Sequence, residues 1–380
     1  MPDFQCRPEP AQREQIFCGQ YYDDLSCTGF LGDPSKERIT VLMLGLADGV
    51  AVAPIFANSR VASLLAVDSD ETAIIRCLDN QKNLPAHFKF ESAVADAAHF
   101  LATTADRYDV IIVDLYTQSA YASIVFDYAF HHLLKDRLNP LGHIVFNGFG
   151  IPMNLDPFNG LSPQAWLAQC LSESWSNINY LPHRRNATFI IGLPPLTTLC
   201  GADQLQSLSP SDLLFLEIMG LRLGYLIPAV KSNEAILPPP LDFVGIDLEM
   251  QKRWTKSLPA LSEMLPESLE LEKPSDLRAL LDVPGACSAL LDRLFEEVSP
   301  LRGTLAVLIA GEINFSNRDV SWFPEWVITK LENSAKINPR DWLEFLIPQA
   351  YAVITHRTNG DLSKVADLQR ALRWHRLISR

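Results

Sequence analysis

The sequence lacks long apolar runs. No stretch approaches the roughly 18 consecutive apolar residues that a membrane-spanning helix needs. The N-terminus, Met1 to Arg7, shows no basic start followed by an apolar run, which is the pattern of a secretory signal. The sequence therefore predicts a cytoplasmic protein that neither crosses nor binds a membrane.

The sequence also lacks a cationic excess and paired cysteines. The formal net charge of −13 argues against a nucleic-acid partner, because binding a phosphate backbone needs clustered Lys and Arg. The seven cysteines include no C-x-x-C pair, which favours free thiols in a reducing compartment over disulfides or a zinc site. No His, Cys or Asp spacing indicates any other metal, so we expect no metal cofactor.

What the sequence does contain is an alternation of strands and helices. The 380 residues, 48% of them hydrophobic, are enough for two domains or one large one. We expect an N-terminal extension at 1–38, a doubly wound α/β domain at 39–199 and an all-helical domain of unknown role at 200–380. Two apolar runs near 178–181 and 187–191 predict a closing hairpin at the sheet edge.

Four apolar strands of the α/β domain each end in an acidic residue. These residues are Asp48, Asp68, Asp96 and Asp114, and the first of them lies in the turn Gly45-Leu46-Ala47-Asp48-Gly49. In an open α/β sheet, ligands bind outside the carboxyl ends of parallel strands. The pattern thus predicts one crevice suited to a nucleoside that carries hydroxyls, a base amine and a cationic group.

Each of these residues also has a simpler interpretation. The glycine turn can be an ordinary strand-to-helix turn, since Ala47 occupies the second glycine position of a G-x-G-x-x-G motif. Asp68 can cap the helix that follows, although Asp70 can do this instead. Asp96 can be a loop or capping residue. For Asp114 the functional interpretation is favoured, because a carboxylate at the mouth of a buried strand needs a partner.

Tyrosines follow the fourth strand. Tyr116 comes directly after Asp114 and Leu115, so its ring is a candidate for cation–π stabilisation of a bound cation. His131, His132 and His183 are expected to be solvated or structural rather than catalytic.

Taken in order, these residues over about 20–193 resemble the spermidine synthase family, within the class I S-adenosylmethionine-binding fold. The resemblance implies a mostly parallel, seven-stranded sheet of the Rossmann-like methyltransferase type. It implies that Gly45 and Gly49 form the cofactor turn and that Asp48 holds the amine of the decarboxylated S-adenosylmethionine tail. It further implies that Asp68 holds the ribose, that Asp96 contacts the adenine and that Asp114 orients and deprotonates the attacking amine.

The resemblance also concerns the acceptor side. Tyr22-Asp23-Asp24-Leu25 lies where the family has Tyr-Gln-Glu-Met, so Tyr22 is expected to border the substrate. Thr117 replaces the family's second acidic residue, three positions after Asp114, which weakens the case for a diamine substrate. The turn is poorer in glycine than in the family, and the helical half is not part of the family pattern.

Three functions follow as hypotheses. The first is a transferase that uses S-adenosylmethionine or its decarboxylated form and moves an aminopropyl or similar group to a small nucleophile, with an amine as one candidate. The second is a methyltransferase acting on a small metabolite. The third is a catalytically inactive binding or assembly protein on the same fold. A homodimer is one candidate assembly.

Overall fold

A computed structural model describes most of the first 192 residues and selected parts of the remainder. The described residues are 16–27, 31–32, 35–80, 89–117, 120–149, 163–183, 186–192, 209–223, 227–228, 242, 244–245, 248, 285, 287–289, 291–292, 322–333, 347, 350–351, 353–354 and 362–378. Two-thirds of the predicted helical half therefore lies outside the described residues, and the predicted division at 199 stays a prediction.

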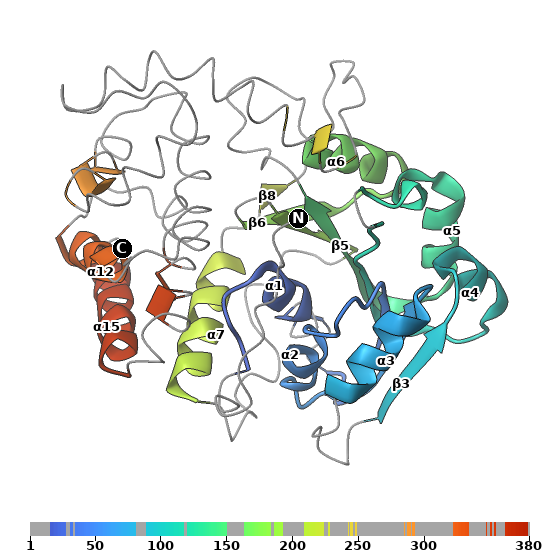
Figure 1. Cartoon of the computed structure of the whole chain (residues 1–380), viewed down its shortest axis with the longest axis horizontal. Coiled ribbons are helices and arrows are strands. Elements are labelled where there is room, and N and C mark those ends of the chain that lie inside the picture. Colours follow the sequence, from blue (N-terminus) through green and yellow to red (C-terminus); the bar gives the residue numbers. More distant parts are fainter. Residues whose placement is uncertain are drawn as a thin grey trace.

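A single twisted sheet forms the centre of the molecule (Figure 1). Its strand order is β3-β2-β1-β4-β5-β7-β6-β8. The first five strands in this order are parallel, whereas β7 and β6 run antiparallel to their neighbours. The seven main strands are β1 (Ile39–Leu44), β2 (Val61–Asp68), β3 (Lys89–Val94), β4 (Tyr108–Val113), β5 (Leu138–Phe149), β6 (Ile178–His183) and β7 (Asn186–Ile191). This confirms the predicted fold, to which a two-residue strand β8 (Ile227–Pro228) is added.

Helices alternate with the parallel strands, as the sequence pattern predicts. They are α2 (Val52–Phe56), α3 (Glu71–Asn80), α4 (Ala97–Thr103), the 3-10 turn η3 (Ser123–Phe126) and α5 (Tyr128–Asp136). In addition, α1 (Tyr21–Cys27) precedes β1, and α6 (Pro163–Ser174) lies between β5 and β6. Pro54 lies in the first turn of α2, where its missing N–H costs no helical hydrogen bond. The hairpin of β6 and β7 pairs from Ile178↔Ile191 to His183↔Asn186, as predicted.

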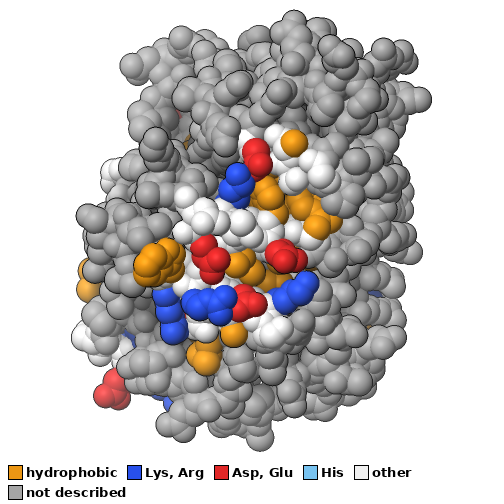
Figure 2. Space-filling view, turned by 90° about the vertical axis from the view of Figure 1, so that its left-hand side faces the viewer, with side chains coloured by type: hydrophobic (Ala, Val, Ile, Leu, Met, Phe, Trp, Pro, Cys, Tyr) orange, Lys and Arg blue, Asp and Glu red, His pale blue; other side chains and the backbone are white. Residues whose placement is uncertain are grey.

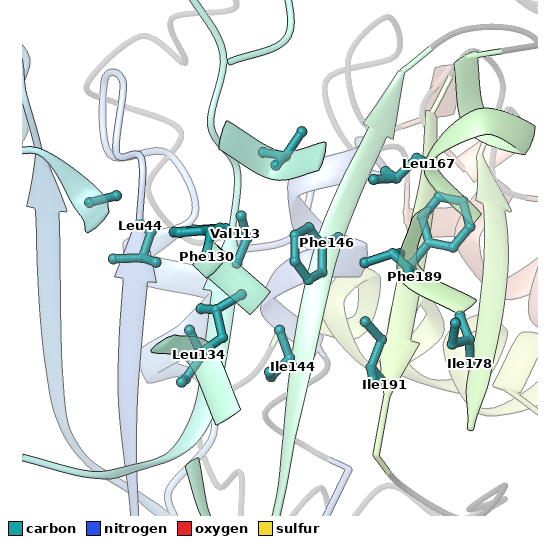
Figure 3. Close-up of a cluster of buried hydrophobic side chains, with 14 of the residues drawn as sticks. Leu44, Val113, Phe130, Leu134, Ile144, Phe146, Leu167, Ile178, Phe189 and Ile191 are labelled. Atoms are coloured by element: carbon teal, nitrogen blue, oxygen red, sulfur yellow. The ribbon is translucent and has the colours of Figure 1, made fainter. Parts of the chain in front are cut away.

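The sheet is covered on both faces. One face packs a cluster that includes Leu44, Val113, Ile144 and Phe146 against Phe130 of α5, as Figure 3 shows. The other face packs residues such as Val41 and Ile112 against Ile55 of α2. β4 is buried along its whole length, and its residues 110–113 are apolar on both faces, which is typical of a central parallel strand.

The described residues beyond 200 are mostly helical. They include α7 (Pro210–Leu223), α12 (Trp322–Asn333) and α15 (Leu362–Ile378), which lie together on the left of Figure 1. On this side, charged groups of both signs surround a few apolar ones (Figure 2). Ion pairs link the helices here, Arg373 to Glu217 at 3.4 Å and Arg370 to Glu332 at 3.8 Å. No described helix is long and apolar enough to cross a membrane.

Candidate functional site

The turn after β1 brings the ends of the central strands into contact. Gly45 has a φ of +86°, and its N–H donates to the Val67 carbonyl at 2.8 Å. The N–H of Asp114 donates to the Leu44 carbonyl at 2.9 Å. A Cβ on residue 45 would overlap the carbonyl oxygen of Asp114. Glycine is therefore required here both by its backbone conformation and by the close approach of β4.

Asp68, at the end of β2, holds this turn in place. One carboxylate oxygen accepts from the N–H of Leu46 at 2.8 Å and of Ala47 at 3.3 Å, and the other accepts from the N–H of Asp70 at 2.9 Å. Asp70 in turn accepts from Thr72 N–H at 2.8 Å, so it supplies the helix cap that Asp68 could have supplied. The carboxylate of Asp68 therefore contacts the turn after β1, at the edge of the sheet where the parallel strands end.

Asp114 is half-buried at the end of the central strand β4. Burial raises the pKa of its carboxyl, a hydrogen bond from Asn147 opposes the rise, and the nearby charge of Asp68 adds to it, so that the pKa lies at about 6. That bond, from Nδ2 of Asn147 to Oδ1 of Asp114, is 2.8 Å long. The charge that acts on Asp114 among the described residues is thus another carboxylate, and such a pair favours a bound cation.

Asn147 on β5 fixes the orientation of Asp114. Its Oδ1 accepts from Nδ2 of Asn186 at 3.0 Å, which leaves Nδ2 to face the carboxylate. Its backbone carbonyl accepts from the Tyr116 hydroxyl at 2.8 Å. The amides of β5 and β7 therefore hold both Asp114 and Tyr116, and neither asparagine was identified from the sequence. In the sequence, each asparagine is only a single polar residue in or beside an apolar run, and this signal is too weak to identify a site residue.

Aromatic rings surround the carboxylate. The rings of Tyr116 and Tyr121 lie 4.9 Å apart between centroids, and the Tyr121 hydroxyl is hydrogen-bonded at the backbone of Phe149. The charge of Asp114 raises the pKa of Tyr21 even more than burial does, so the Tyr21 phenol lies within electrostatic reach of the carboxylate. Tyr21 also acts on the pKa of Tyr116, together with burial and Tyr121. Tyr21 was not singled out from the sequence, and its connection to Asp114 is electrostatic.

The neighbouring Tyr22, which the sequence predicts at the substrate, lies beside Tyr21: both pack against the same core cluster, and their ring centroids are 5.6 Å apart. Its hydroxyl lies 2.7 Å from the Cys18 sulfur, and its ring packs against the core cluster around β1 and α2. Substrate contact by Tyr22 stays a prediction.

The other predicted residues lie around the rim. Asp48 is 60% exposed and pairs with Arg76 of α3 at 2.7 Å, while Gly49, at a φ of +72°, packs against Cys77. Asp96 is exposed and caps α4 by accepting from His99 N–H at 2.9 Å. Thr117 is exposed and closes the loop onto the Ala120 carbonyl with its N–H and its hydroxyl.

The structure therefore brings some of the predicted residues together. Asp114, Asp68 and Tyr116 form one cluster with Tyr21 and Asn147 at the carboxyl edge of the sheet. The carboxylates of Asp48 and Asp96 have local partners instead. Among the described residues, no group of His, Cys, Asp and Glu is arranged to hold a metal ion.

The fold and this cluster define an α/β protein of the Rossmann-like methyltransferase type, with carboxylates at the strand ends. Residues 25–155, about a third of the chain, match the family model of the spermine/spermidine synthase domain. This match confirms the resemblance inferred from the sequence, and it includes Asp48, Asp68, Asp96 and Asp114.

Solved structures that align with part of this chain include a methyltransferase-like protein and spermidine synthases. Human methyltransferase-like protein 13, in complex with SAH, aligns at 15% identity with a TM-score of 0.39, over 54% of this chain and 90% of that one. A spermidine synthase in complex with the transition state analogue AdoDATO aligns at 17% identity with a TM-score of 0.38. The alignment covers 51% of this chain and 65% of that one. The spermidine synthase of Thermotoga maritima aligns at 17% identity with a TM-score of 0.35. The alignment covers 51% of this chain and 64% of that one.

The aligned region thus spans slightly less than two thirds of both spermidine synthases. No curated protein sequence matches this chain significantly.

Proposed function

We propose that this protein is a transferase that uses S-adenosylmethionine or its decarboxylated form, with the chemistry of a spermidine synthase. It moves an aminopropyl or similar group from the sulfonium to a small nucleophile, for which an amine is our candidate. The observation that carries the proposal is the half-buried carboxylate of Asp114, set among tyrosines and beside Asp68. The spermine/spermidine synthase domain match over these residues supports it.

The residues present fit such a cofactor in their chemistry. Two carboxylates and the faces of tyrosine rings are suited to a sulfonium cation. Asp68 would hold the ribose hydroxyls while it also holds the turn, and Asp96 would contact the adenine. Gly45 and Gly49 would line the cofactor, and Asp48 would hold the amine of its tail. When bound, the cofactor supplies an activated leaving group, so the protein needs little acid–base chemistry.

The protein's own part is to orient the acceptor and to take one proton. We assign Asp114 as the base or anchor for the acceptor, because a carboxyl group with a pKa of about 6 is ionised at neutral pH and still basic. Asn147 keeps one carboxylate oxygen in a fixed direction. Tyr116, Thr117 and Tyr22 are the predicted substrate-side residues, to which the structure adds Tyr21.

One observation favours methyl transfer as a second candidate function. The Asp48–Arg76 pair places a carboxylate and a guanidinium together at the cofactor turn. Such a pair is complementary to a tail with both an amine and a carboxylate, as in intact S-adenosylmethionine. A decarboxylated tail would leave Arg76 without a role in binding.

Titration calorimetry with four ligands tests these proposals. The ligands are S-adenosylmethionine, its decarboxylated form, methylthioadenosine and S-adenosylhomocysteine. Tight binding of methylthioadenosine and the decarboxylated form supports aminopropyl transfer, whereas preferential binding of S-adenosylhomocysteine supports methyl transfer. If none of the four binds, the enzyme proposal fails and the inactive binding protein is favoured.

A matched pair of variants then tests the assignment of Asp114. Asp114→Asn keeps the shape of the side chain but removes the base, so we expect turnover to fall by about 10²- to 10⁴-fold while methylthioadenosine still binds. Asp106→Asn makes the same change in the exposed loop before β4 and should leave both unchanged. Full turnover in Asp114→Asn would show that another group is the base.

A further inference from the structure

The turn after β1 uses most of its backbone N–H groups within the protein. Those of Gly45 and Gly49 donate to backbone carbonyls at 2.8 and 2.9 Å. Those of Leu46 and Ala47 donate to the carboxylate of Asp68 at 2.8 and 3.3 Å. Strand-to-helix turns bind anions through such N–H groups. Because these groups already have acceptors in this turn, an anionic part of a ligand needs another donor here.

Helix α3 lies against the turn and brings a cation to it. A Cβ on Gly49 would overlap the sulfur of Cys77 and lie 3.4 Å from the Cα of the same residue, so the helix backbone approaches the turn closely. Arg76 precedes Cys77 in α3, and its Nε donates to Oδ1 of Asp48 at 2.7 Å. The packing of α3 at Gly49 therefore places the guanidinium of Arg76 at the turn.

This guanidinium can bind a second carboxylate. A guanidinium is planar and carries five N–H groups on three nitrogens, so it can contact one carboxylate through Nε and another through its two terminal nitrogens. In Arg76, Nε is bonded to Asp48, and within the described residues Nη1 and Nη2 have no hydrogen-bond partner. The side chain is 50% exposed, so a ligand can reach it.

The surrounding charges give Arg76 its importance for an anionic ligand. Asp48 and Asp68 contribute two carboxylates at the turn, and α3 itself carries Glu71 and Asp79. Like charges repel, so these groups oppose the binding of a further carboxylate. A tail with an amine alone can be held by Asp48. A tail with an amine and a carboxylate needs the cation of Arg76 as well.

We propose that Arg76 is a specificity-determining residue, which binds the carboxylate of the S-adenosylmethionine tail while Asp48 binds its amine. The site then selects the intact cofactor over the decarboxylated form. This inference rests on the proposed function, because it requires the tail of the cofactor to lie at the turn after β1. It applies whichever group leaves the sulfonium, since the same cofactor is bound before either transfer.

Two ligands that differ only in the carboxylate test the proposal. S-Adenosylhomocysteine has both an amine and a carboxylate on its tail, whereas S-adenosyl-3-thiopropylamine has the amine alone, and neither carries a sulfonium. Titration calorimetry on the full chain gives the ratio of their dissociation constants. In the unaltered protein we expect S-adenosylhomocysteine to bind about 10-fold more tightly. In Arg76→Gln this preference should disappear or reverse, because Asp48 then repels the carboxylate.

A conservative variant and a matched control complete the experiment. Arg76→Lys keeps the positive charge but cannot contact two carboxylates with one planar group, so it should retain only part of the preference. Arg107→Gln makes the glutamine substitution just before β4, at the opposite edge of the sheet, where Nη1 of Arg107 donates to the Leu138 carbonyl at 3.1 Å. This control should leave the ratio of the two dissociation constants unchanged.

The outcomes separate this inference from the proposed function. A general distortion of the turn weakens both ligands alike, so the ratio reports on the carboxylate alone. A preference for S-adenosylhomocysteine that is lost in Arg76→Gln supports the proposal. An unchanged ratio in Arg76→Gln, or tighter binding of S-adenosyl-3-thiopropylamine to the unaltered protein, overturns the role of Arg76 and leaves the transferase proposal intact. Binding of neither ligand, nor of methylthioadenosine, refutes both.

Discussion

At the scale of single residues, the carboxylate of Asp114 has unusual surroundings. It accepts a hydrogen bond from Asn147, it is near Asp68, and tyrosine rings lie around it. The hydrogen bond favours the ionised form, but burial and the second carboxylate oppose it. The net result is a carboxyl group that changes its charge near pH 6. Two measurements follow from this single property.

The first prediction concerns ligand charge. Decarboxylated S-adenosylmethionine is cationic at its sulfur, so its affinity should rise as Asp114 ionises, by about 10-fold between pH 5 and pH 7. Methylthioadenosine lacks this charge and should bind equally well at both pH values. Calorimetry on both ligands gives the comparison, and Asp114→Asn should abolish the difference between them. Parallel pH profiles for the two ligands would contradict the assignment.

The second prediction concerns stability. The folded-state pKa of Asp114, about 6, lies above its ordinary value of 3.8, so the folded protein binds the proton more tightly than the unfolded one. This contribution is present below pH 4 and is lost as the pH rises through 6. Asp114→Asn should therefore stabilise the protein at pH 8 by about 1–2 kcal/mol, but not at pH 4. Urea unfolding at both pH values, with Asp106→Asn as control, measures this.

The sequence predicted the acidic residues of the site better than its other members. Asp114 and Asp68 were identifiable because each ends an apolar strand, and the parallel sheet brings such ends to one edge. Tyr21 and Asn147 were not identifiable, because their roles depend on the rotation of α1 and on the register of β5 with β4. For Asp96 the sequence allowed either a helix cap or an adenine contact. The structure shows the cap, and the same carboxylate can also contact an adenine.

At the scale of elements, the contact between the ends of β1 and β4 shapes the site. It requires Gly45, whose added Cβ would overlap the backbone of Asp114. The apolar runs predicted near 178–181 and 187–191 lie within the observed β6 and β7. Pro140 and Gly142 are residues typical of turns, yet β5 begins at Leu138 and includes both. Its pairing with β4 has a register shift between Tyr108 and Val110.

The third prediction compares two glycines at positive φ. Gly45→Ala should destabilise the protein by about 3 kcal/mol or more, because the φ of +86° is strained for Ala and the methyl group forces β1 and β4 apart. Gly32→Ala has a φ of +133°, but the structure describes no atom within 4 Å of the added Cβ. This control isolates the backbone term, which should cost about 1–2 kcal/mol.

Chemical denaturation of both glycine variants measures the loss in free energy of unfolding that each substitution causes. Methylthioadenosine binding shows whether the candidate site is altered. The ligand should bind more weakly to Gly45→Ala and normally to Gly32→Ala. An equal loss in free energy of unfolding for the two substitutions would show that β4 can shift to accommodate the added methyl group. The close approach at Gly45 would then not determine the geometry of the site.

At the scale of the whole molecule, the N-terminal segment, the sheet and α7 are joined by buried contacts. The predicted extension at 1–38 contains α1, whose Asp24 is held by Arg222 at 198 positions' distance in the sequence. No local pattern could predict this, because a buried ion pair of such separation has no periodic signal. The predicted boundary at 199 stays a prediction, and the contacts of Phe17 with Asp212 and of Asp24 with Arg222 cross it.

The fourth prediction concerns the pH dependence of these contacts. Burial alone would raise the pKa of Asp24, but the charges of Arg222 and His183 lower it to about 2. Because the folded-state pKa lies below the ordinary 3.8, Asp24 contributes stability above pH 4 that is lost as the pH falls through 2. Arg222→Met leaves Asp24 buried beside His183 alone, at a cost of about 3–5 kcal/mol at pH 7.

That cost should shrink as the pH is lowered towards 3.5, since Asp24 can then take up a proton and no longer needs a cation. Urea unfolding at both pH values measures the change. Arg373→Met is a suitable control, because its partner Glu217 also lies on α7 but the Arg373 side chain is 63% exposed, and such a surface pair contributes less than about 1 kcal/mol. A cost for Arg222→Met that does not depend on pH would mean that packing of the long side chain, rather than its charge, connects α7 to α1.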